Sequence, residues 1–161
     1  MKIPEGLRKP ILALTITAAG VGGIAVSEGF RDTAYRPLPT DKVTIGYGST
    51  NYADGSAVKP GDKITREEAN KLLKNKLSLF ERGLKSCVKV PLAQYEYEAF
   101  ISLEYNIGVG AFCGSTLVKR LNQYDYKGAC QEILKWNKFQ GHPLQGLTNR
   151  RQKEYKQCLG Q

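Results

Sequence analysis

The feature that most constrains this chain is the uncharged apolar stretch ILALTITAAGVGGIAV at residues 11–26. Basic residues precede it, among them Lys2, Arg8 and Lys9. A positive stretch followed by an apolar one is typical of an export signal, and a helix needs about 17 apolar residues to span a bilayer. Glycine, alanine and threonine dilute the apolar character here, so such a helix could enter a membrane and later leave it. The alternative is a helix packed in the protein's own core.

The size and charge of the chain restrict its class. A length of 161 residues fits one folding unit, which could be organised as two lobes around a cleft. Apolar residues make up 41% and charged residues 24%, which is a globular composition. The net charge of +9 favours an acidic partner such as nucleic acid, anionic lipid or cell wall, although many basic proteins bind none of them. The sequence contains no phosphate loop and no convincing nucleic-acid motif, so we expect no nucleic-acid partner.

The cysteine content bears on compartment and metal binding. Cys87, Cys113, Cys130 and Cys158 show no close C-x-x-C spacing, and His142 is the single histidine, which argues against a zinc site. An even number of cysteines fits two disulfides in an oxidising compartment such as the periplasm. Four buried thiols in a cytosolic protein are the alternative.

The secondary-structure pattern predicts an α+β fold. Residues 43–49 are typical of a short strand whose glycines allow close backbone approach. Thr65 and Glu68 have capping-box spacing at the start of a predicted helix at 66–82. Further predicted helices run from after Pro91 to a stop at Gly108, and lie near 115–122, 126–137 and 147–158. We therefore expect a small β-containing N-terminal lobe and a larger helical C-terminal lobe.

Glu28 lies two residues beyond the apolar stretch. Cleavage of a glycosidic bond requires a carboxylic acid that protonates the departing oxygen, while a second group positions water or attacks the sugar. At the end of an apolar helix, poor solvation would keep a carboxyl group protonated, as such an acid must be. The alternative is an ordinary exposed glutamate at a helix end.

A series of short motifs extends over almost the whole chain after residue 27. In order they are Glu28-Gly29-Phe30-Arg31, Tyr35, Thr44-Ile45-Gly46-Tyr47-Gly48, VKPGDKITREEA at 58–69, YNIGVGAFCGSTLVKRLN at 105–122, Trp136-Asn137 and GLTNRRQKE at 146–154. Together these motifs resemble the phage-type lysozymes, glycoside hydrolase family 24. The resemblance implies a lysozyme-like α+β fold, with a small and a larger lobe around a cleft.

The resemblance also implies catalytic roles. The family cleaves the β-1,4 bond between N-acetylmuramic acid and N-acetylglucosamine, with Glu28 as general acid and Thr44 as the hydroxyl that holds the attacking water. A threonine hydroxyl both donates and accepts hydrogen bonds, although Thr44 also fits a routine strand residue. Pro37 stands where the family has its aspartate. Asp41, in the same loop, either takes that catalytic place or is a turn residue on the surface.

By the same resemblance, the residues expected to bind substrate are Tyr35, Gly46, Tyr47, Asn106 and Arg150. Arg150 and Arg151 match a double arginine of the family, where an arginine pairs with the catalytic glutamate; the alternative is a solvated basic helix face. A helix C-cap explains Asn106 nearly as well. Trp136 is expected in the core rather than as a platform for a sugar.

These expectations describe an exported phage endolysin. Residues 1–27 would form a weakly apolar helix similar to signal-anchor-release segments, and residues 28–161 the catalytic domain. Peptidoglycan is the expected substrate, and the inner membrane a transient partner through residues 10–27, so the predicted location is the host periplasm. We expect a monomer with no cofactor and no metal. The resemblance also implies the disulfides Cys130–Cys158 and Cys87–Cys113.

Two other functions fit the same sequence. A lytic transglycosylase also uses a lone glutamate without an aspartate, which matches the displaced acid. A non-enzymatic cationic protein that binds membrane or cell wall would need only the apolar N-terminus and the charge of +9. Products with anhydro-muramic ends would indicate the first, and lytic activity that survives Glu28→Gln would indicate the second.

Overall fold

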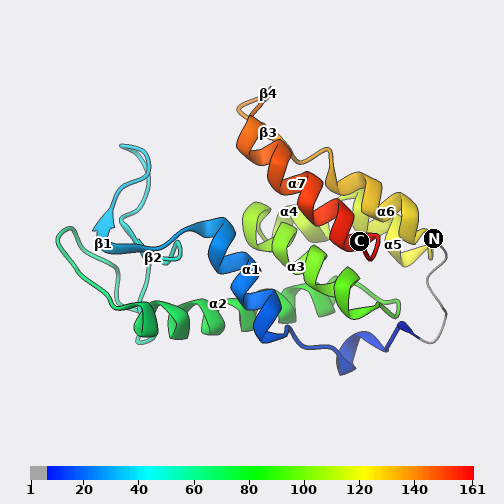
Figure 1. Cartoon of the computed structure of the whole chain (residues 1–161), viewed down its shortest axis with the longest axis horizontal. Coiled ribbons are helices and arrows are strands. Elements are labelled where there is room, and N and C mark those ends of the chain that lie inside the picture. Colours follow the sequence, from blue (N-terminus) through cyan, green and yellow to red (C-terminus); the bar gives the residue numbers. More distant parts are fainter. Residues whose placement is uncertain (1–6) are drawn as a thin grey trace. The chain divides into compact units, whose positions relative to one another are not determined.

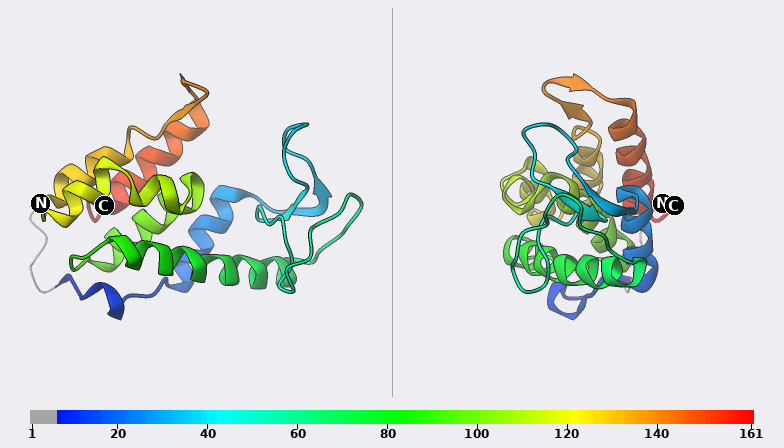
Figure 2. Two further views of the ribbon diagram at one scale, coloured as in Figure 1. Left: turned by 180° about the vertical axis from the view of Figure 1, so that it is seen from behind. Right: turned by 90° about the vertical axis from the view of Figure 1, so that its left-hand side faces the viewer.

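The computed structural model describes residues 7–161, which form two compact units. One unit consists of residues 17–79, and the other combines residues 7–16 with residues 80–161. Figures 1 and 2 show the helices and strands coloured along the sequence. The predicted boundary between residues 27 and 28 is not a boundary between these units. Instead, the apolar stretch at 11–26 divides before Thr17, and its two parts belong to different units.

The apolar stretch divides because a helix begins after Thr17. Helix α1 spans Ala18–Glu28, and its N-cap Thr17 is extended, with a side chain that accepts a hydrogen bond from the Gly20 N–H at 3.1 Å. Upstream, η2 at Ile11–Ala13 is one short 3-10 turn. A threonine N-cap satisfies an otherwise unpaired N–H and so favours a helix start at this point. Gly29, with a φ of +73°, ends α1 directly after Glu28.

A two-stranded antiparallel sheet follows α1. Strand β1, Arg31–Tyr35, pairs with β2, Thr44–Gly46 (Figure 1). Residues 62–64 bond to β1 as well, since the Ala34 N–H donates to the Asp62 carbonyl at 2.8 Å. The strand predicted at 43–49 is confirmed in its first part, and the rest of it forms a tight turn. Strand β1 was not predicted because its sequence, RDTAY, has no apolar alternation.

Helix α2, Arg66–Cys87, begins with the predicted capping box. The Thr65 N–H donates to the Glu68 carboxylate at 2.9 Å, and the Glu68 N–H donates to the Thr65 hydroxyl at 3.2 Å. This reciprocal pair satisfies two N–H groups that the helix itself leaves without partners. The helix continues to Cys87 rather than ending near residue 82, so it begins in the 17–79 unit and ends in the other.

The helical unit is built around α3, Gln94–Ile107, in which every residue from Glu96 to Tyr105 is buried. Helix α3 packs against α7, Gln145–Cys158, as Figure 1 shows. The other elements are α4 at Val109–Cys113, α5 at Thr116–Asn122, α6 at Tyr126–Ile133, and the short hairpin of β3 at Lys138–Phe139 and β4 at His142–Pro143. The helices predicted in this region are confirmed with small shifts of their ends. Helix α4 and the hairpin were not predicted.

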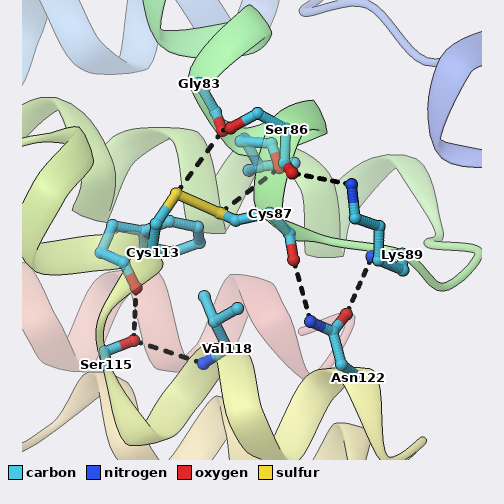
Figure 3. Close-up of a disulfide and its surroundings, with 10 residues drawn as sticks. Gly83, Ser86, Cys87, Lys89, Cys113, Ser115, Val118 and Asn122 are labelled. Atoms are coloured by element: carbon cyan, nitrogen blue, oxygen red, sulfur yellow. Dashed lines mark hydrogen bonds between the residues drawn. A yellow bond between two sulfur atoms is a disulfide. The ribbon is translucent and has the colours of Figure 1, made fainter.

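Two disulfides, Cys87–Cys113 and Cys130–Cys158, join elements of the helical unit, so the pairing implied by the resemblance is confirmed. Their Cα atoms lie 5.6 and 5.7 Å apart. Beside the first disulfide, Asn122 donates to the Cys87 carbonyl and accepts from the Lys89 N–H, both at 2.8 Å (Figure 3). Closing loops of this length restricts the unfolded chain and contributes on the order of 3 kcal/mol per disulfide.

Residues 7–16, called the N-terminal strap below, lie against the helical unit. The backbone of Lys9 pairs with that of Leu92 at N–O distances of 2.8 and 3.0 Å. The side chain of Leu14 is buried. Side chains of α2 and α3 bind the strap backbone. The Lys85 ammonium donates to the Leu14 carbonyl, the Gln94 amide donates to the Thr15 carbonyl, and the Glu81 carboxylate accepts from the Ile16 N–H. Within residues 7–161, no helix has both the length and the apolar character needed to cross a membrane.

Glu104 of α3 is a carboxylic acid in the core of the helical unit. Its side chain is 0% exposed, and neither carboxyl oxygen has a hydrogen-bond partner among the described residues. Burial, and then the charge of Glu81, raise the pKa of Glu104 to about 8. Glu81 itself accepts a hydrogen bond from the Tyr97 hydroxyl at 2.8 Å. Glu104 is therefore held as a neutral acid over most of the physiological pH range.

Glu104→Gln is expected to stabilise the protein at alkaline pH. The pKa of Glu104 is about 8 in the folded protein and about 4.3 in an unfolded chain. The stability gained by holding the proton is therefore complete below about pH 4 and is lost as the pH rises to about 8. Glutamine does not titrate, so urea unfolding should find the variant about 4–5 kcal/mol more stable than the wild type at pH 8 and nearly equal near pH 4.5.

The matched control is Glu67→Gln, because the Glu67 carboxylate is exposed on α2 beside Lys71. This change should leave the free energy of unfolding within about 0.5 kcal/mol of the wild type at every pH. Parallel stability curves for wild type and Glu104→Gln between pH 4.5 and pH 9 would contradict the account of the buried acid.

Candidate active site

Glu28 and Thr44, the two residues first proposed as catalytic, both belong to the 17–79 unit. Glu28 is the last residue of α1 and is half-buried. The positive φ of Gly29 turns the chain from the helix into β1, and β1 pairs with the strand that Thr44 begins. The acid thus ends α1 and the hydroxyl begins β2 of the same small unit, and they are connected through residues 29–30, strand β1 and its pairing with β2.

The Thr44 hydroxyl has a defined orientation. Thr44 is buried, with 7% of its surface exposed, and is the register partner of Tyr35 across the β1–β2 pair. Its Oγ1 donates to the Lys42 carbonyl at 3.1 Å. A hydroxyl has one proton to donate and two lone pairs that accept. With the proton directed to Lys42, the oxygen remains an acceptor for a further donor such as a water molecule.

The end of β2 and the residues that follow it, residues 45–49 and here called the turn after β2, lie close to α2. Two backbone hydrogen bonds of 2.9 Å between Ile45 and Ser49 close it. Gly46 has a φ of +66°, and a Cβ built there would lie 3.0 Å from the Cβ of Ala69. The backbone conformation and the close packing both favour glycine at this position. The expected role of Gly46 in substrate binding stays a prediction.

The two tyrosines expected to bind substrate have different surroundings. Tyr47 is buried, and its ring lies 5.5 Å from that of Phe30, centroid to centroid. Tyr35 is half-buried at the end of β1, and the Arg31 guanidinium lies 4.9 Å from its ring centroid. The substrate-binding roles of both tyrosines stay predictions.

Asp41 ends a backbone turn in the loop between the strands. Its N–H donates to the Leu38 carbonyl at 2.9 Å, and its own carbonyl accepts from the Arg36 guanidinium at 2.6 Å. These bonds agree with the interpretation of Asp41 as a turn residue, although the residue is half-buried rather than fully exposed. A catalytic role for its carboxylate stays a prediction, because backbone bonds do not restrict that group.

Of the site residues expected in the helical unit, Asn106 is exposed near the end of α3. The C-cap of this helix is Gly108, so the alternative interpretation of Asn106 as the C-cap is wrong. Its Oδ1 accepts a hydrogen bond from the Arg151 guanidinium at 2.8 Å. Arg150 is half-buried, and its Nε lies 3.3 Å from a carboxylate oxygen of Glu154. The substrate-binding roles of Asn106 and Arg150 stay predictions.

Arg151 is a structural residue of the helical unit. Only 1% of its surface is exposed, and its guanidinium contacts both carboxylate oxygens of Glu154, at 2.7 and 2.8 Å. The Ser102 hydroxyl donates to the same carboxylate at 2.6 Å. The interpretation of this arginine as part of a solvated basic face is therefore wrong. The i, i+3 spacing of Arg151 and Glu154 was the sequence signal that could have indicated the pair.

Trp136 is half-buried rather than a fully buried core residue, and its carbonyl accepts from the Arg151 guanidinium at 3.3 Å.

In the part of the chain that the structure describes, no group of three or more histidine, cysteine, aspartate or glutamate residues is placed to hold a metal ion.

Comparison with known proteins identifies relatives over most of the chain. The sequence model of the phage lysozyme family matches residues 25–154. The chain is 41% identical over 142 residues to an endolysin of Bacillus phage B103, covering 88% of this chain and 52% of that protein. It is 31% identical over 166 residues to a SAR-endolysin of Enterobacteria phage P21, covering 98% of each. The chain thus spans about half the length of the Bacillus phage endolysins that it matches.

A solved structure of a P22 lysozyme variant is similar in fold. It covers 91% of this chain and 99% of its own, with a TM-score of 0.80 and 37% sequence identity. This likeness confirms the lysozyme-like α+β fold that the sequence predicts.

Arg151→Met is expected to destabilise the protein by about 3–5 kcal/mol, because it leaves the buried Glu154 carboxylate without its main counter-charge. The measurement is urea unfolding at pH 7. Lys153→Met, at an exposed position of the same helix, is the matched control and should change stability by less than about 0.5 kcal/mol. A loss below about 1 kcal/mol for Arg151→Met would contradict a structural role for this ion pair.

Proposed function

The chain belongs to the phage lysozyme family, and we propose that it is an endolysin that hydrolyses peptidoglycan. The bond it cleaves is the β-1,4 bond between N-acetylmuramic acid and N-acetylglucosamine, and the cleavage lyses the host cell for phage release. The family match at 25–154 includes Glu28, Asp41 and Thr44. The net charge of +9 supports an acidic polymer such as the cell wall as the substrate.

Glu28 is the proposed general acid. A half-buried carboxyl group at the end of α1 would donate its proton to the glycosidic oxygen as the bond from that oxygen to the anomeric carbon breaks. The leaving sugar then departs with a neutral hydroxyl. Positive charge develops on the anomeric carbon and the ring oxygen, and water must reach that carbon from the opposite face to invert its configuration. As the oxygen of this water bonds to the carbon, the water releases a proton to solvent.

Thr44 is the proposed holder of that water. Because its own proton is donated to Lys42, Oγ1 would accept a hydrogen bond from the water, whose oxygen keeps a lone pair for the sugar. This orientation of the hydroxyl is the observation that carries the mechanism. Asp41, in the same loop, is the proposed source of negative charge for the oxocarbenium-like transition state. Asn106 and Arg150 are proposed as substrate contacts of the helical unit.

Glu28→Gln is expected to lower the rate of cell-wall hydrolysis about 10³-fold, because glutamine keeps the shape of the side chain but has no acidic proton. Thr44→Ala should lower it about 10²-fold, and Thr44→Ser, which keeps the hydroxyl, should retain most of the activity. Asp41→Asn should lower it about tenfold. The measurement is the loss of turbidity of chloroform-treated Gram-negative cells.

Product analysis separates the rival chemistries in the same samples. Mass spectrometry should find reducing ends, whereas anhydro-muramic ends would indicate a lytic transglycosylase. If Glu28→Gln lyses cells as fast as the wild type, lysis does not depend on the acid and the non-enzymatic function is favoured. An unchanged rate for Asp41→Asn would leave Asp41 as a turn residue alone.

We also propose that residues 10–27 hold the enzyme transiently at the inner membrane, facing the host periplasm. The similarity to a SAR-endolysin over nearly the whole chain supports this. In this structure α1 has 11 residues. Its length is about 16 Å, which is roughly half the thickness of a bilayer's apolar core. Insertion would require residues 11–17 to join α1 in one longer helix.

The strap and the membrane therefore compete for the same residues. A helix through residues 11–17 would give up the hydrogen bonds of the strap with Lys85, Gln94 and Glu81. Glu28 follows Val26 by two residues, so insertion would hold the acid at the bilayer surface. The tethered form should be inactive for that reason.

Substituting leucine for both Gly22 and Gly23 is expected to prolong tethering. Both glycines are exposed, and no atom of the described residues lies within 4 Å of a Cβ built at either, so the released form accommodates the change. Each leucine favours insertion by roughly 0.5 kcal/mol. Membrane fractionation should find more bound protein, and lysis should begin later, while released protein keeps wild-type activity on purified walls.

Serine at both positions is the matched control, since it adds a side chain without apolar character, and it should not increase the membrane-bound fraction. The tethering proposal fails if membrane-inserted protein hydrolyses purified walls as fast as released protein.

A further inference from the structure

Lys76 lies on the buried face of α2. In the 17–79 unit, the buried stripe of this helix includes Ala69, Leu73 and Leu77. Lys76 follows Ala69 by seven residues and Leu73 by three, so it shares their face of the helix. It is half-buried. A lysine in such a place loses part of its hydration, and polar contacts must compensate for that loss.

The Lys76 ammonium contacts the turn after β2. Its Nζ donates a hydrogen bond to the Gly48 carbonyl at 3.1 Å. Gly48 has a φ of +91° and lies inside the turn that the Ile45–Ser49 hydrogen bonds close. The turn is thus fastened to α2 at two points, by close packing at Gly46 and by the lysine at Gly48.

Lys76 is also coupled electrostatically to the proposed acid. Burial lowers the pKa of Lys76, and the attraction of the Glu28 carboxylate counteracts part of this effect. The same ammonium therefore contacts the turn that follows Thr44 and attracts the charge of Glu28.

We infer that Lys76 is a positioning residue of the active site, which fastens the turn after Thr44 to α2 and stabilises the carboxylate that Glu28 becomes once its proton has been transferred. This inference rests on the proposed function of Glu28 and Thr44. General acid catalysis leaves a new negative charge in a half-buried place, and a nearby ammonium lowers the free energy of that state. In this step the proton of Glu28 passes to the glycosidic oxygen, and the attacking water releases a proton to solvent.

The test compares Lys76→Met, which removes charge and donor, with Lys76→Arg, which keeps both. Rates of hydrolysis of purified peptidoglycan are measured over a range of substrate concentrations. For Lys76→Met we expect a kcat about tenfold lower and a KM that changes little, because the turn is no longer fastened to α2. Lys76→Arg should restore most of the wild-type rate. Lys74→Met, at an exposed position of α2, should leave the rate unchanged.

A double-mutant cycle on thermal stability tests the coupling without any activity. Lys76→Met is made in the wild type and in Glu28→Gln. The loss in Tm caused by Lys76→Met should be about 2 °C smaller in the Glu28→Gln background, where the carboxylate is absent.

Two outcomes overturn the inference in distinguishable ways. If Lys76→Met leaves the rate of hydrolysis unchanged and the Tm losses add independently, Lys76 is a structural lysine only. The proposed function still stands in that case, provided that Glu28→Gln is inactive. If Glu28→Gln hydrolyses peptidoglycan at the wild-type rate, the proposed function fails and the inference fails with it.

Discussion

The turn after β2 can occupy its place only because α2 meets it without side-chain bulk. A Cβ at Gly46 would crowd Ala69, and the positive φ of Gly46 is a conformation that glycine adopts without strain. The close approach brings the Gly48 carbonyl within reach of Lys76. Thr44, at the start of the same strand, is buried, and its hydroxyl is directed to a carbonyl of its own loop. The close packing of the strand that carries the proposed water-holding group on α2 thus depends on one glycine meeting one alanine.

The helices could be predicted well because their signals are local. The capping box of Thr65 and Glu68 and the stop at Gly108 each involve residues within one or two turns of the helix end. Strand β1 could not be predicted, because it is stabilised by pairing with β2 and with residues 62–64 rather than by its own composition. Glu28 and Thr44 were identified by resemblance. The hydrogen bond that orients Thr44, and the coupling of Lys76 to Glu28, required the tertiary structure.

The buried charged side chains of the helical unit were not predicted from the sequence. Hydropathy assigns Glu104 and Arg151 to the surface, yet both are buried in the helical unit. Arg151 is buried because Glu154 and Asn106 satisfy its guanidinium. Glu104 is held as a neutral acid because burial, and then the charge of Glu81, make its ionisation unfavourable. A buried ion pair needs both partners in place, and a buried lone acid needs its proton, so each depends on contacts that exist only after α3 and its neighbours have packed.

Glu28 lies where an apolar helix meets the first strand, so one displacement of α1 changes all of its surroundings. Only residues 29–30 separate α1 from β1, and β1 pairs with the strand that carries Thr44. Lys76 belongs to α2 and would not move with α1. A helix drawn into lipid would therefore separate the acid from the hydroxyl and from the ammonium in the same movement. On the proposed mechanism, tethering inhibits through both geometry and electrostatics, because the helix that binds the membrane ends at the catalytic acid.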